Sequence, residues 1–122
     1  MTKRVLLIED EANIAEAIRF LLTRDGWQVR VMGEGGEALA MVAAYKPDLV
    51  ILDLMLPDVS GFEILTALRS DAATKTLPVL MLTAKGQDRD RDAALRAGVS
   101  LFMTKPFANA EIRAAVRELL GG

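Results

Sequence analysis

The sequence predicts an α/β fold in which five strands alternate with five helices and the helices cover both faces of a parallel sheet. Short, nearly continuous apolar runs recur along the chain, as expected of strands that are buried on both faces. Stretches with apolar residues at helical spacing separate these runs. The 122 residues are 52% hydrophobic and 26% charged, which suits one domain covering residues 1–122. Right-handed crossovers then give a doubly wound sandwich, although the periodicity alone does not fix the strand order.

The first strand–helix unit occupies the N-terminal segment. Residues 4–8, RVLLI, are predicted to form an apolar strand. Apolar side chains then recur along one face of a helix over residues 14–22. Asn13 and Glu16 are predicted to cap the start of this helix, and Gly26 is predicted to end it.

The second and third units follow in the same order. Residues 27–32, WQVRVM, alternate between apolar and polar, which predicts a strand near the edge of the sheet, and a helix is predicted from about residue 36 to residue 45. Residues 49–52, LVIL, form the strand expected to be most deeply buried. Ser60 and Glu63 have the spacing of a capping box, which predicts the start of the third helix.

The last two units fill the C-terminal part of the chain. Residues 78–82, PVLML, and residues 100–104, SLFMT, are predicted to be the fourth and fifth strands. Between them, residues 88–98 form a charged helix whose inner face is mostly alanine. Apolar side chains at helical spacing over residues 112–120 predict the last helix.

The composition excludes several kinds of chemistry. The chain has no cysteine, which removes disulfides and thiolate zinc sites, and no histidine, which removes the commonest general base. The net charge of −2, with both signs interspersed, is a poor basis for binding nucleic acid directly. No apolar run is long enough for a membrane helix, and the N-terminus lacks a signal-peptide pattern, so we expect a cytoplasmic protein with no membrane partner.

Chemistry-bearing residues follow four of the five predicted strands. The carboxyl ends of parallel strands meet at one edge of an open sheet, where such folds bind ligands. The residues are Glu9, Asp10 and Glu11 after the first strand, Asp53 after the third, Thr83 and Ala84 after the fourth, and Lys105 and Pro106 after the fifth. Singly, each is explained as a turn former, a helix cap or a solvated charge. Those explanations do not account for acids, a hydroxyl and a lysine converging on one edge.

The acids at this edge are expected to repel one another unless a cation binds between them. Two carboxylates about 5 Å apart repel by roughly 3 kcal/mol at an effective dielectric constant of about 20, and we expect Asp10 and Asp53 to form such a pair. Oxygen ligands without histidine or cysteine favour Mg²⁺ or Mn²⁺. A carboxylate beside the ion, Lys105 and the Thr83 hydroxyl can attack phosphorus, because a transferring phosphoryl group needs mainly positive charge and hydrogen-bond donors around it. We therefore interpret Asp53 as a nucleophile.

Four motifs resemble those of the receiver domains of two-component response regulators. LLIEDE, DLVILDLMLPDVSGFEIL, PVLMLTAKG and FMTKPF occur in order along the whole chain. The resemblance implies a flavodoxin-like (βα)5 fold with strand order 2-1-3-4-5. It implies a phosphorylation-controlled signalling switch, in which a histidine kinase or phosphotransfer protein phosphorylates Asp53 and the surface of the fourth helix, fifth strand and fifth helix changes. A downstream protein, or an output domain, would read that change.

The resemblance also implies a set of metal ligands. Asp53 is the phosphoacceptor and a ligand of Mg²⁺. Asp10 is expected to bind the ion directly and Glu9 to bind it through water. The backbone carbonyl of Met55 supplies a further ligand.

A second group of residues is expected to contact the phosphoryl group. Lys105 pairs with a phosphoryl oxygen, and the Thr83 hydroxyl hydrogen-bonds to the group and moves with it. The backbone amides of Leu54 and Ala84 are expected to donate to the same oxygens. Thr83 and Phe102 together form the switch, in which Phe102 turns inward on activation.

Two further features follow from the resemblance. The peptide bond between Lys105 and Pro106 is expected to be cis. Met55 and Lys85 flank the site at positions that tune hydrolysis in this family, and we expect a phosphoryl lifetime of minutes or longer.

The sequence departs from the family pattern at the predicted output face. The switch aromatic is Phe102 rather than the common tyrosine, so it carries no hydroxyl. Ser100 and Leu101 stand where many DNA-binding regulators of the winged-helix class carry two aspartates that help to build a symmetric dimer. Their absence weakens the case for that phosphorylation-dependent dimer.

Two other classes of function compete with the switch. An aspartate-nucleophile phosphatase also uses Mg²⁺ and a lysine, but such enzymes place an acid/base aspartate two residues after the nucleophile, and Met55 occupies that position here. A flavodoxin-like interaction module with a silent site is the other alternative, and the nearly complete set of site residues argues against it. We expect a phosphoacceptor that assists its own phosphorylation and slow dephosphorylation, and not an enzyme.

Overall fold

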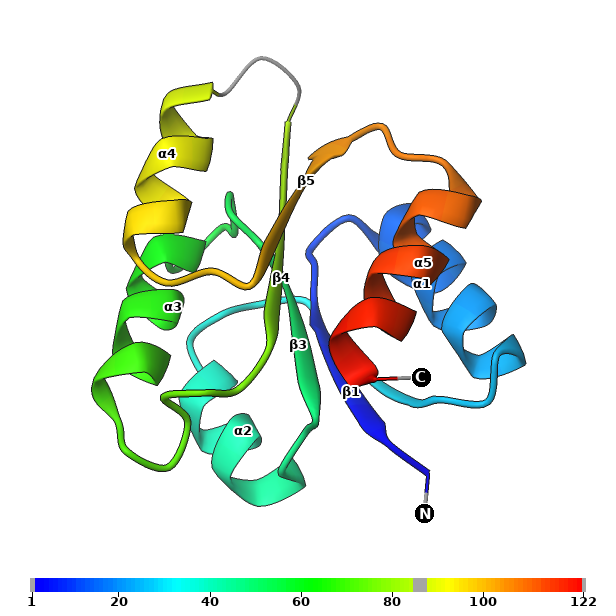
Figure 1. The fold of residues 1–122 in the computed structure, drawn as a ribbon, viewed down its shortest axis with the longest axis horizontal. Coiled ribbons are helices and arrows are strands. Elements are labelled where there is room, and N and C mark those ends of the chain that lie inside the picture. The colour runs from blue at the N-terminus through cyan, green and yellow to red at the C-terminus, as the bar shows by residue number, and fades with distance from the viewer. Residues whose placement is uncertain (1, 85–87, 122) are drawn as a thin grey trace.

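The chain folds into a five-stranded parallel sheet covered by five helices (Figure 1). The computed structural model describes residues 2–84 and 88–121. The strand order is β2-β1-β3-β4-β5, which confirms the predicted fold and order. The elements are β1 (Arg4–Ile8), α1 (Ala12–Arg24), β2 (Gln28–Met32), α2 (Ala38–Tyr45), β3 (Leu49–Asp53), α3 (Gly61–Ser70), β4 (Val79–Ala84), α4 (Asp88–Arg96), β5 (Leu101–Lys105) and α5 (Asn109–Leu120).

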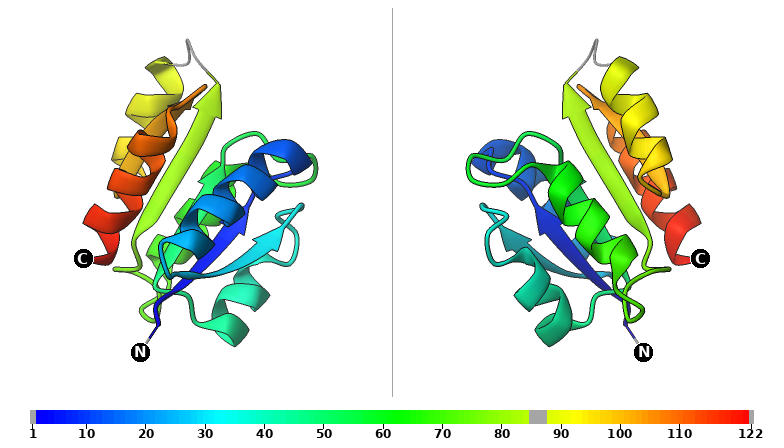
Figure 2. Two further views of the ribbon diagram at one scale, coloured as in Figure 1. Left: turned by 90° about the vertical axis from the view of Figure 1, so that its right-hand side faces the viewer. Right: turned by 90° about the vertical axis from the view of Figure 1, so that its left-hand side faces the viewer.

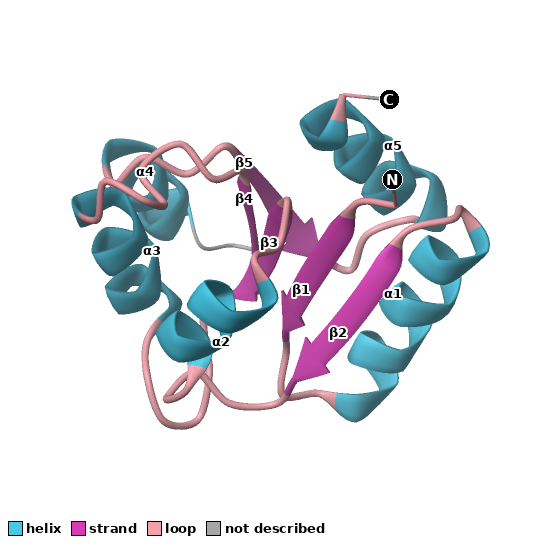
Figure 3. Ribbon diagram, turned by 90° about the horizontal axis from the view of Figure 1, so that it is seen from below, coloured by secondary structure: helices cyan, strands magenta, loops and turns pink. Residues whose placement is uncertain are grey.

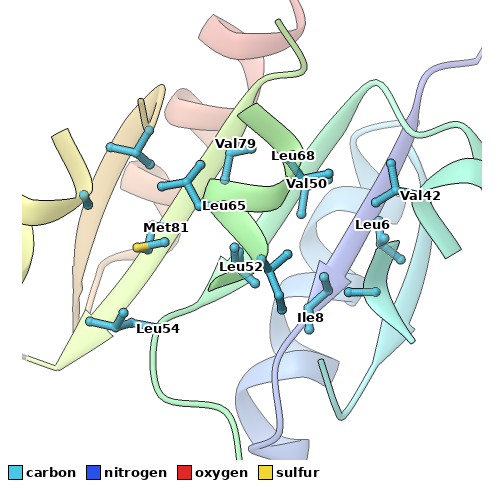
Figure 4. Close-up of a cluster of buried hydrophobic side chains, with 14 residues drawn as sticks. Leu6, Ile8, Val42, Val50, Leu52, Leu54, Leu65, Leu68, Val79 and Met81 are labelled. Atoms are coloured by element: carbon cyan, nitrogen blue, oxygen red, sulfur yellow. The ribbon is translucent and has the colours of Figure 1, made fainter. Parts of the chain in front are cut away.

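The helices form two layers on opposite faces of the sheet, as the view along the strands shows (Figure 3). One hydrophobic cluster joins α2, α3 and α4 to the sheet through buried side chains such as Val42, Leu65 and Ala94 (Figure 4). The other joins α1 and α5 to the opposite face, for example through Ile18 and Ile112. Both layers are therefore held by apolar side chains removed from water, the main source of stability in such folds.

The strands run in one direction, so their carboxyl ends lie at the end of the molecule opposite the N-terminus (Figure 2). Strands β3, β4 and β5 each extend one or two residues further than the apolar runs predicted. Backbone pairing explains the difference, because Asp53 pairs with Leu82 and Ala84 pairs with Lys105 in the ladder. Asp53, Thr83 and Lys105 thus lie at or next to the last residue of a strand, and Glu9 and Asp10 directly follow β1.

The predicted helix ends are confirmed at two places and wrong at one. Gly26 follows α1 with φ +98°, a left-handed conformation that favours glycine. Ser60 caps α3, although its Oγ accepts from Phe62 N rather than from the Glu63 amide of a full capping box. The predicted capping pair of Asn13 with Glu16 is wrong, because α1 begins earlier and both residues lie inside it.

Among the residues described, no helix has both the length and the apolar character needed to cross a membrane.

Candidate functional site

Three carboxylates gather at the carboxyl ends of β1 and β3. Oxygen atoms of Glu9, Asp10 and Asp53 all lie within 4.8 Å of one another. Glu9 and Asp53 are 1% and 3% exposed, whereas Asp10 is exposed. The strands place them there because β1 and β3 are adjacent and parallel. The arrangement presents several hard oxygen ligands to one point, as the sequence analysis expected.

Lys105, at the end of β5, is the cation of this cluster. Its Nζ lies 2.7 Å from Glu9 Oε1, 3.4 Å from Asp53 Oδ1 and 3.6 Å from Glu11 Oε1. Burial alone would lower the pKa of Lys105, but its close contact with Glu9 and the charge of Asp53 raise it above the usual value. The lysine therefore stays charged and sits where an anion bound at Asp53 would meet it.

A single lysine does not balance the buried acids. Burial raises the pKa of Glu9 to about 7, even though Lys105 and the Glu11 amide both favour the charged form. Burial likewise raises the pKa of Asp53, and Lys105 opposes that shift only in part. Both shifts arise from burial that the positive charge of Lys105 offsets only in part among the described residues. A divalent cation would supply further positive charge.

Two buried polar atoms lack a hydrogen-bond partner among the described residues, Glu9 Oε1 and Thr83 Oγ1. Glu9 Oε1 is close to Lys105 Nζ and forms an ion pair with it that lacks hydrogen-bond geometry. Thr83 is 1% exposed and its hydroxyl has no such neighbour. A buried polar group left unsatisfied costs about 1–3 kcal/mol. The contact of the Thr83 hydroxyl with a phosphoryl group stays a prediction, and the hydroxyl has no competing partner among the described residues.

The backbone donors at the site differ from the prediction at one position. Leu54 N donates to Leu82 O at 2.9 Å, because the ladder between β3 and β4 continues one residue beyond Asp53. The prediction that the Leu54 amide contacts a phosphoryl group is therefore wrong. The amide that faces the carboxylate is that of Met55, whose N lies 3.4 Å from Asp53 Oδ1. The Ala84 amide stays a prediction, and Ala84 is exposed at the end of β4.

Asp58, in the loop between β3 and α3, and Gly61, the first residue of α3, make contacts that hold this loop in place. A Cβ on Gly61 would lie 2.6 Å from Asp53 O and 2.9 Å from Leu54 Cα, so only glycine permits this close approach. The Asp58 carboxylate accepts hydrogen bonds from Gly35 N (2.9 Å) and Gly36 N (2.7 Å). The turn signals Pro57, Asp58 and Gly61 were visible in the sequence, but these long-range contacts were not.

The predicted switch residues share one face of the sheet. Along β4 and β5 the side chains alternate between faces, which puts Thr83 and Phe102 on the side covered by α4. Met81 pairs with Phe102, and Thr83 is two residues further along β4, so the two switch residues are diagonal neighbours. Phe102 is partly buried against the core. The Lys105–Pro106 bond is cis, as predicted, and Lys85 lies outside the described residues.

This fold and strand-end site define a class of phosphorylation-controlled switches. The family model for the response regulator receiver domain matches residues 5–117, and the chain belongs to this family. Receiver domains are the signalling switches of two-component systems and not classical enzymes, and they are generally Mg²⁺-dependent. The findings do not favour the phosphatase or the silent interaction module.

The similar proteins are themselves response regulators. The probable transcriptional regulatory protein TcrX of Mycobacterium tuberculosis is 43% identical over 95% of this chain and 49% of its own length. The alkaline phosphatase synthesis transcriptional regulatory protein PhoP of Bacillus subtilis is 38% identical over 98% of this chain and 49% of its own. The chain thus spans about half the length of these curated relatives.

Solved structures give the same result. The chemotaxis response regulator CheY4 of Vibrio cholerae superposes with a TM-score of 0.91 at 27% identity, covering 98% of this chain and 100% of that one. The receiver domain of a signal transduction histidine kinase from Syntrophus aciditrophicus gives a TM-score of 0.91 at 30% identity, covering 99% and 92% of the two chains.

Proposed function

We propose that Asp53 is the phosphoacceptor of this receiver domain and that residues 1–122 act as one phosphorylation unit. The observation that carries the proposal is the position of the Asp53 carboxylate, buried at the end of the central strand and 3.4 Å from Lys105 Nζ. A carboxylate oxygen there attacks the phosphorus of the donor's phosphohistidine and forms an acyl phosphate, while the bond from phosphorus to the histidine nitrogen breaks and the imidazole leaves. Lys105 and the Thr83 hydroxyl are the groups available to hold the transferred oxygens, together with the amides of Met55 and Ala84.

The carboxylate cluster fits Mg²⁺, or Mn²⁺ as the second choice. We assign Asp10 and Asp53 as direct ligands, Glu9 as a ligand through water and the Met55 carbonyl as a further ligand, a set of hard oxygen atoms. When bound, the ion supplies positive charge that neutralises the carboxylates and the phosphoryl oxygens. The raised pKa of Glu9 supports the assignment, because it reflects the positive charge that the protein alone does not provide.

The signal passes from Asp53 to the face formed by α4 and β5. Phosphorylation adds negative charge at Asp53. Thr83 then hydrogen-bonds to the new group, and Phe102, its diagonal neighbour on β5, turns into the space that Thr83 leaves. Because these two side chains lie on the side covered by α4, that helix shifts and a downstream protein or output domain reads the change.

The phosphodonor is a histidine kinase or phosphotransfer protein, which has to approach the strand ends. A mostly apolar cleft of about 510 Å³ opens beside Lys105, between α1 and the segment that follows β5. Ile14, Leu21 and Phe107 contribute to its apolar lining. We propose that the donor packs there. Small donors such as acetyl phosphate reach Asp53 without a partner protein, so the domain also assists its own phosphorylation. Met55 and Lys85 hold the sequence positions that tune hydrolysis in this family, and we expect the acyl phosphate to last minutes or longer.

Substitution of the acceptor tests the proposal. The Asp53→Asn variant should incorporate no phosphate from acetyl phosphate in the presence of Mg²⁺, as measured by intact-protein mass. Asp71→Asn, directly after the C-terminal end of α3 and at the amino end of β4, is the control and should be phosphorylated like the wild type. Mg²⁺-dependent incorporation into Asp53→Asn at the wild-type rate would contradict the assignment.

A further inference from the structure

Helix α2 differs from every other described helix in having no charged side chain. None of the seven residues from Ala38 to Ala44 is polar, and the eighth is Tyr45. The other four helices all carry charged residues on their outer faces, such as Glu16 on α1, Glu63 on α3 and Glu118 on α5. A helix that is apolar on all sides is normally buried on all sides. The outer face of α2 therefore lacks a partner in the monomer.

The apolar outer face is exposed to solvent. Ala38 and Val42 are buried against the sheet, whereas Ala40, Ala43 and Ala44 are exposed. Leu39 is 48% exposed, a large apolar side chain standing out from otherwise small neighbours. A leucine that protrudes from a surface of alanines can pack into a complementary depression on another surface.

A groove lies beside the same side of the helix. It has a volume of about 430 Å³ between the second half of α2 and the connection from α3 to β4, which lie at one end of the molecule (Figure 1). Its mainly apolar lining includes Ala43, Pro47, Ala73 and Leu77. Leu39 precedes Ala43 by four positions, so the leucine and the groove border the same line along the helix. The protrusion and the depression are thus parts of one surface.

We propose that this surface, named here the α2 face (the outer side of α2 with the adjoining groove), pairs two copies of the chain with their α2 helices antiparallel. A two-fold axis requires a surface that is complementary to itself. The α2 face meets that requirement in shape, because an antiparallel arrangement brings Leu39 of each copy over the second half of the other helix, where the groove lies.

Charge supports the same orientation. Glu37 stands directly before α2 and Lys46 directly after it. Neither takes part in an ion pair within the residues described. In the antiparallel pair, Glu37 faces Lys46 of the partner subunit at both ends, and the helix dipoles also oppose each other. A parallel arrangement would instead bring like charges together.

The pairing should be weak and independent of phosphorylation. An eight-residue helix and one groove bury less than the roughly 800 Å² per partner typical of stable complexes, so we expect a dissociation constant on the order of 100 μM. The α2 face includes none of the residues assigned to phosphoryl transfer. Asp53→Asn should therefore dimerise like the wild type, which separates this proposal from the proposed function.

Sedimentation velocity of the 122-residue chain over a concentration series tests the pairing. The wild type should shift from monomer to dimer as concentration rises, and Leu39→Glu should weaken the association by about tenfold or more. The matched control is Leu95→Glu on α4, where the leucine is 53% exposed, and its association should equal that of the wild type. A wild type that stays monomeric at millimolar concentration would overturn the proposal, as would equal effects of the two substitutions.

Exchanging the charges of Glu37 and Lys46 tests the orientation of the two helices and leaves the apolar side chains of the α2 face unchanged. Glu37→Lys and Lys46→Glu should each weaken dimerisation, because each sets like charges together at both ends of the pair. The double variant restores opposite charges and should restore the wild-type dissociation constant. If the double variant is no tighter than the single variants, the antiparallel pairing is wrong.

Discussion

At the residue scale, the site contains buried charged and polar groups whose desolvation is only partly offset by partners among the described residues. Glu9 is almost wholly buried, and its pKa of about 7 lies well above that of a solvated glutamate. Thr83 is equally buried with an unpartnered hydroxyl. Such groups destabilise a fold unless a ligand satisfies them. Their presence together at one strand edge is more informative than any of them alone, because strain of this kind gathers at functional sites.

The pKa of Glu9 predicts how metal binding depends on pH. The folded protein holds the Glu9 proton more tightly than the unfolded chain does. This group therefore stabilises the ion-free fold below about pH 4.5, and that contribution is lost as pH rises through about 7. Because Mg²⁺ competes with this proton, the increase in Tm produced by saturating Mg²⁺ should be larger at pH 8 than at pH 5. Thermal unfolding with and without the ion measures it.

The Glu9→Gln variant is the control for this dependence. It carries no titrating group at the position, so the difference in Mg²⁺-induced Tm between the two pH values should shrink. A difference as large as that of the wild type would assign the effect to another group.

The unpartnered hydroxyl predicts that removing it from Thr83 makes the fold more stable and phosphorylation slower. Thr83→Val keeps the shape of the side chain and removes the unsatisfied oxygen, so the free energy of unfolding should rise by about 1 kcal/mol. The same change removes a proposed phosphoryl contact and should slow phosphorylation by acetyl phosphate. Urea unfolding and phosphorylation kinetics measure the two effects. A variant that is less stable than the wild type, or equally fast, would count against a hydroxyl reserved for the ligand.

At the element scale, the loop between β3 and α3 is the part that shapes the site. It is fixed at one end by the close approach of Gly61 to Asp53 and is tied by Asp58 to the two glycines before α2. Met55, whose carbonyl is a proposed ligand, lies between Asp53 and Asp58 in the sequence. The geometry of a metal ligand thus depends on a carboxylate that does not touch the metal, as is common in metal sites.

Removal of that attachment should weaken metal binding. Asp58→Ala loses both acceptors for Gly35 N and Gly36 N, so the Mg²⁺ dissociation constant should rise by about tenfold. Asp58→Asn keeps one acceptor oxygen and should lie between Asp58→Ala and the wild type. Fluorescence or calorimetric titration with MgCl₂ gives both values. An unchanged affinity in Asp58→Ala would show that the loop is held without this contact.

The same loop marks the limit of what the sequence could predict. The helix faces and the meeting of Asp10, Asp53 and Lys105 followed from periodicity and from the shared sheet edge. The strand order followed from the family resemblance, because periodicity alone does not fix it. The Leu54 amide was assigned wrongly, because its partner, Leu82 O, depends on where the β3–β4 ladder stops. The contacts of Asp58 and Gly61 were missed because they join residues that the pattern does not relate.

At the scale of the whole molecule, α4 is anchored less firmly than α1 and α5. Helices α1 and α5 share an extensive cluster and are further joined by two hydrogen bonds of 2.8 Å between Arg113 and Asp25. On α4, by contrast, Ala94 is the buried side chain of residues 89–96, and most of its neighbours are charged. An element held by so little apolar area opens more readily than the rest of a fold. Helix α4 is thus the element expected to respond, next to the more firmly packed α3.

This asymmetry predicts which face changes when the phosphoryl group is mimicked. Addition of Mg²⁺ and beryllofluoride, which occupies the position of a phosphoryl group on the acceptor, should alter amide hydrogen exchange in α4 and β5. Exchange in α1 should stay nearly constant, because its hydrophobic cluster lies on the face of the sheet opposite to Thr83 and Phe102. Asp53→Asn cannot accept the mimic and should show neither change. Altered exchange concentrated in α1 would mean that the signal leaves through the opposite layer, and that the diagonal contact between Thr83 and Phe102 does not carry it.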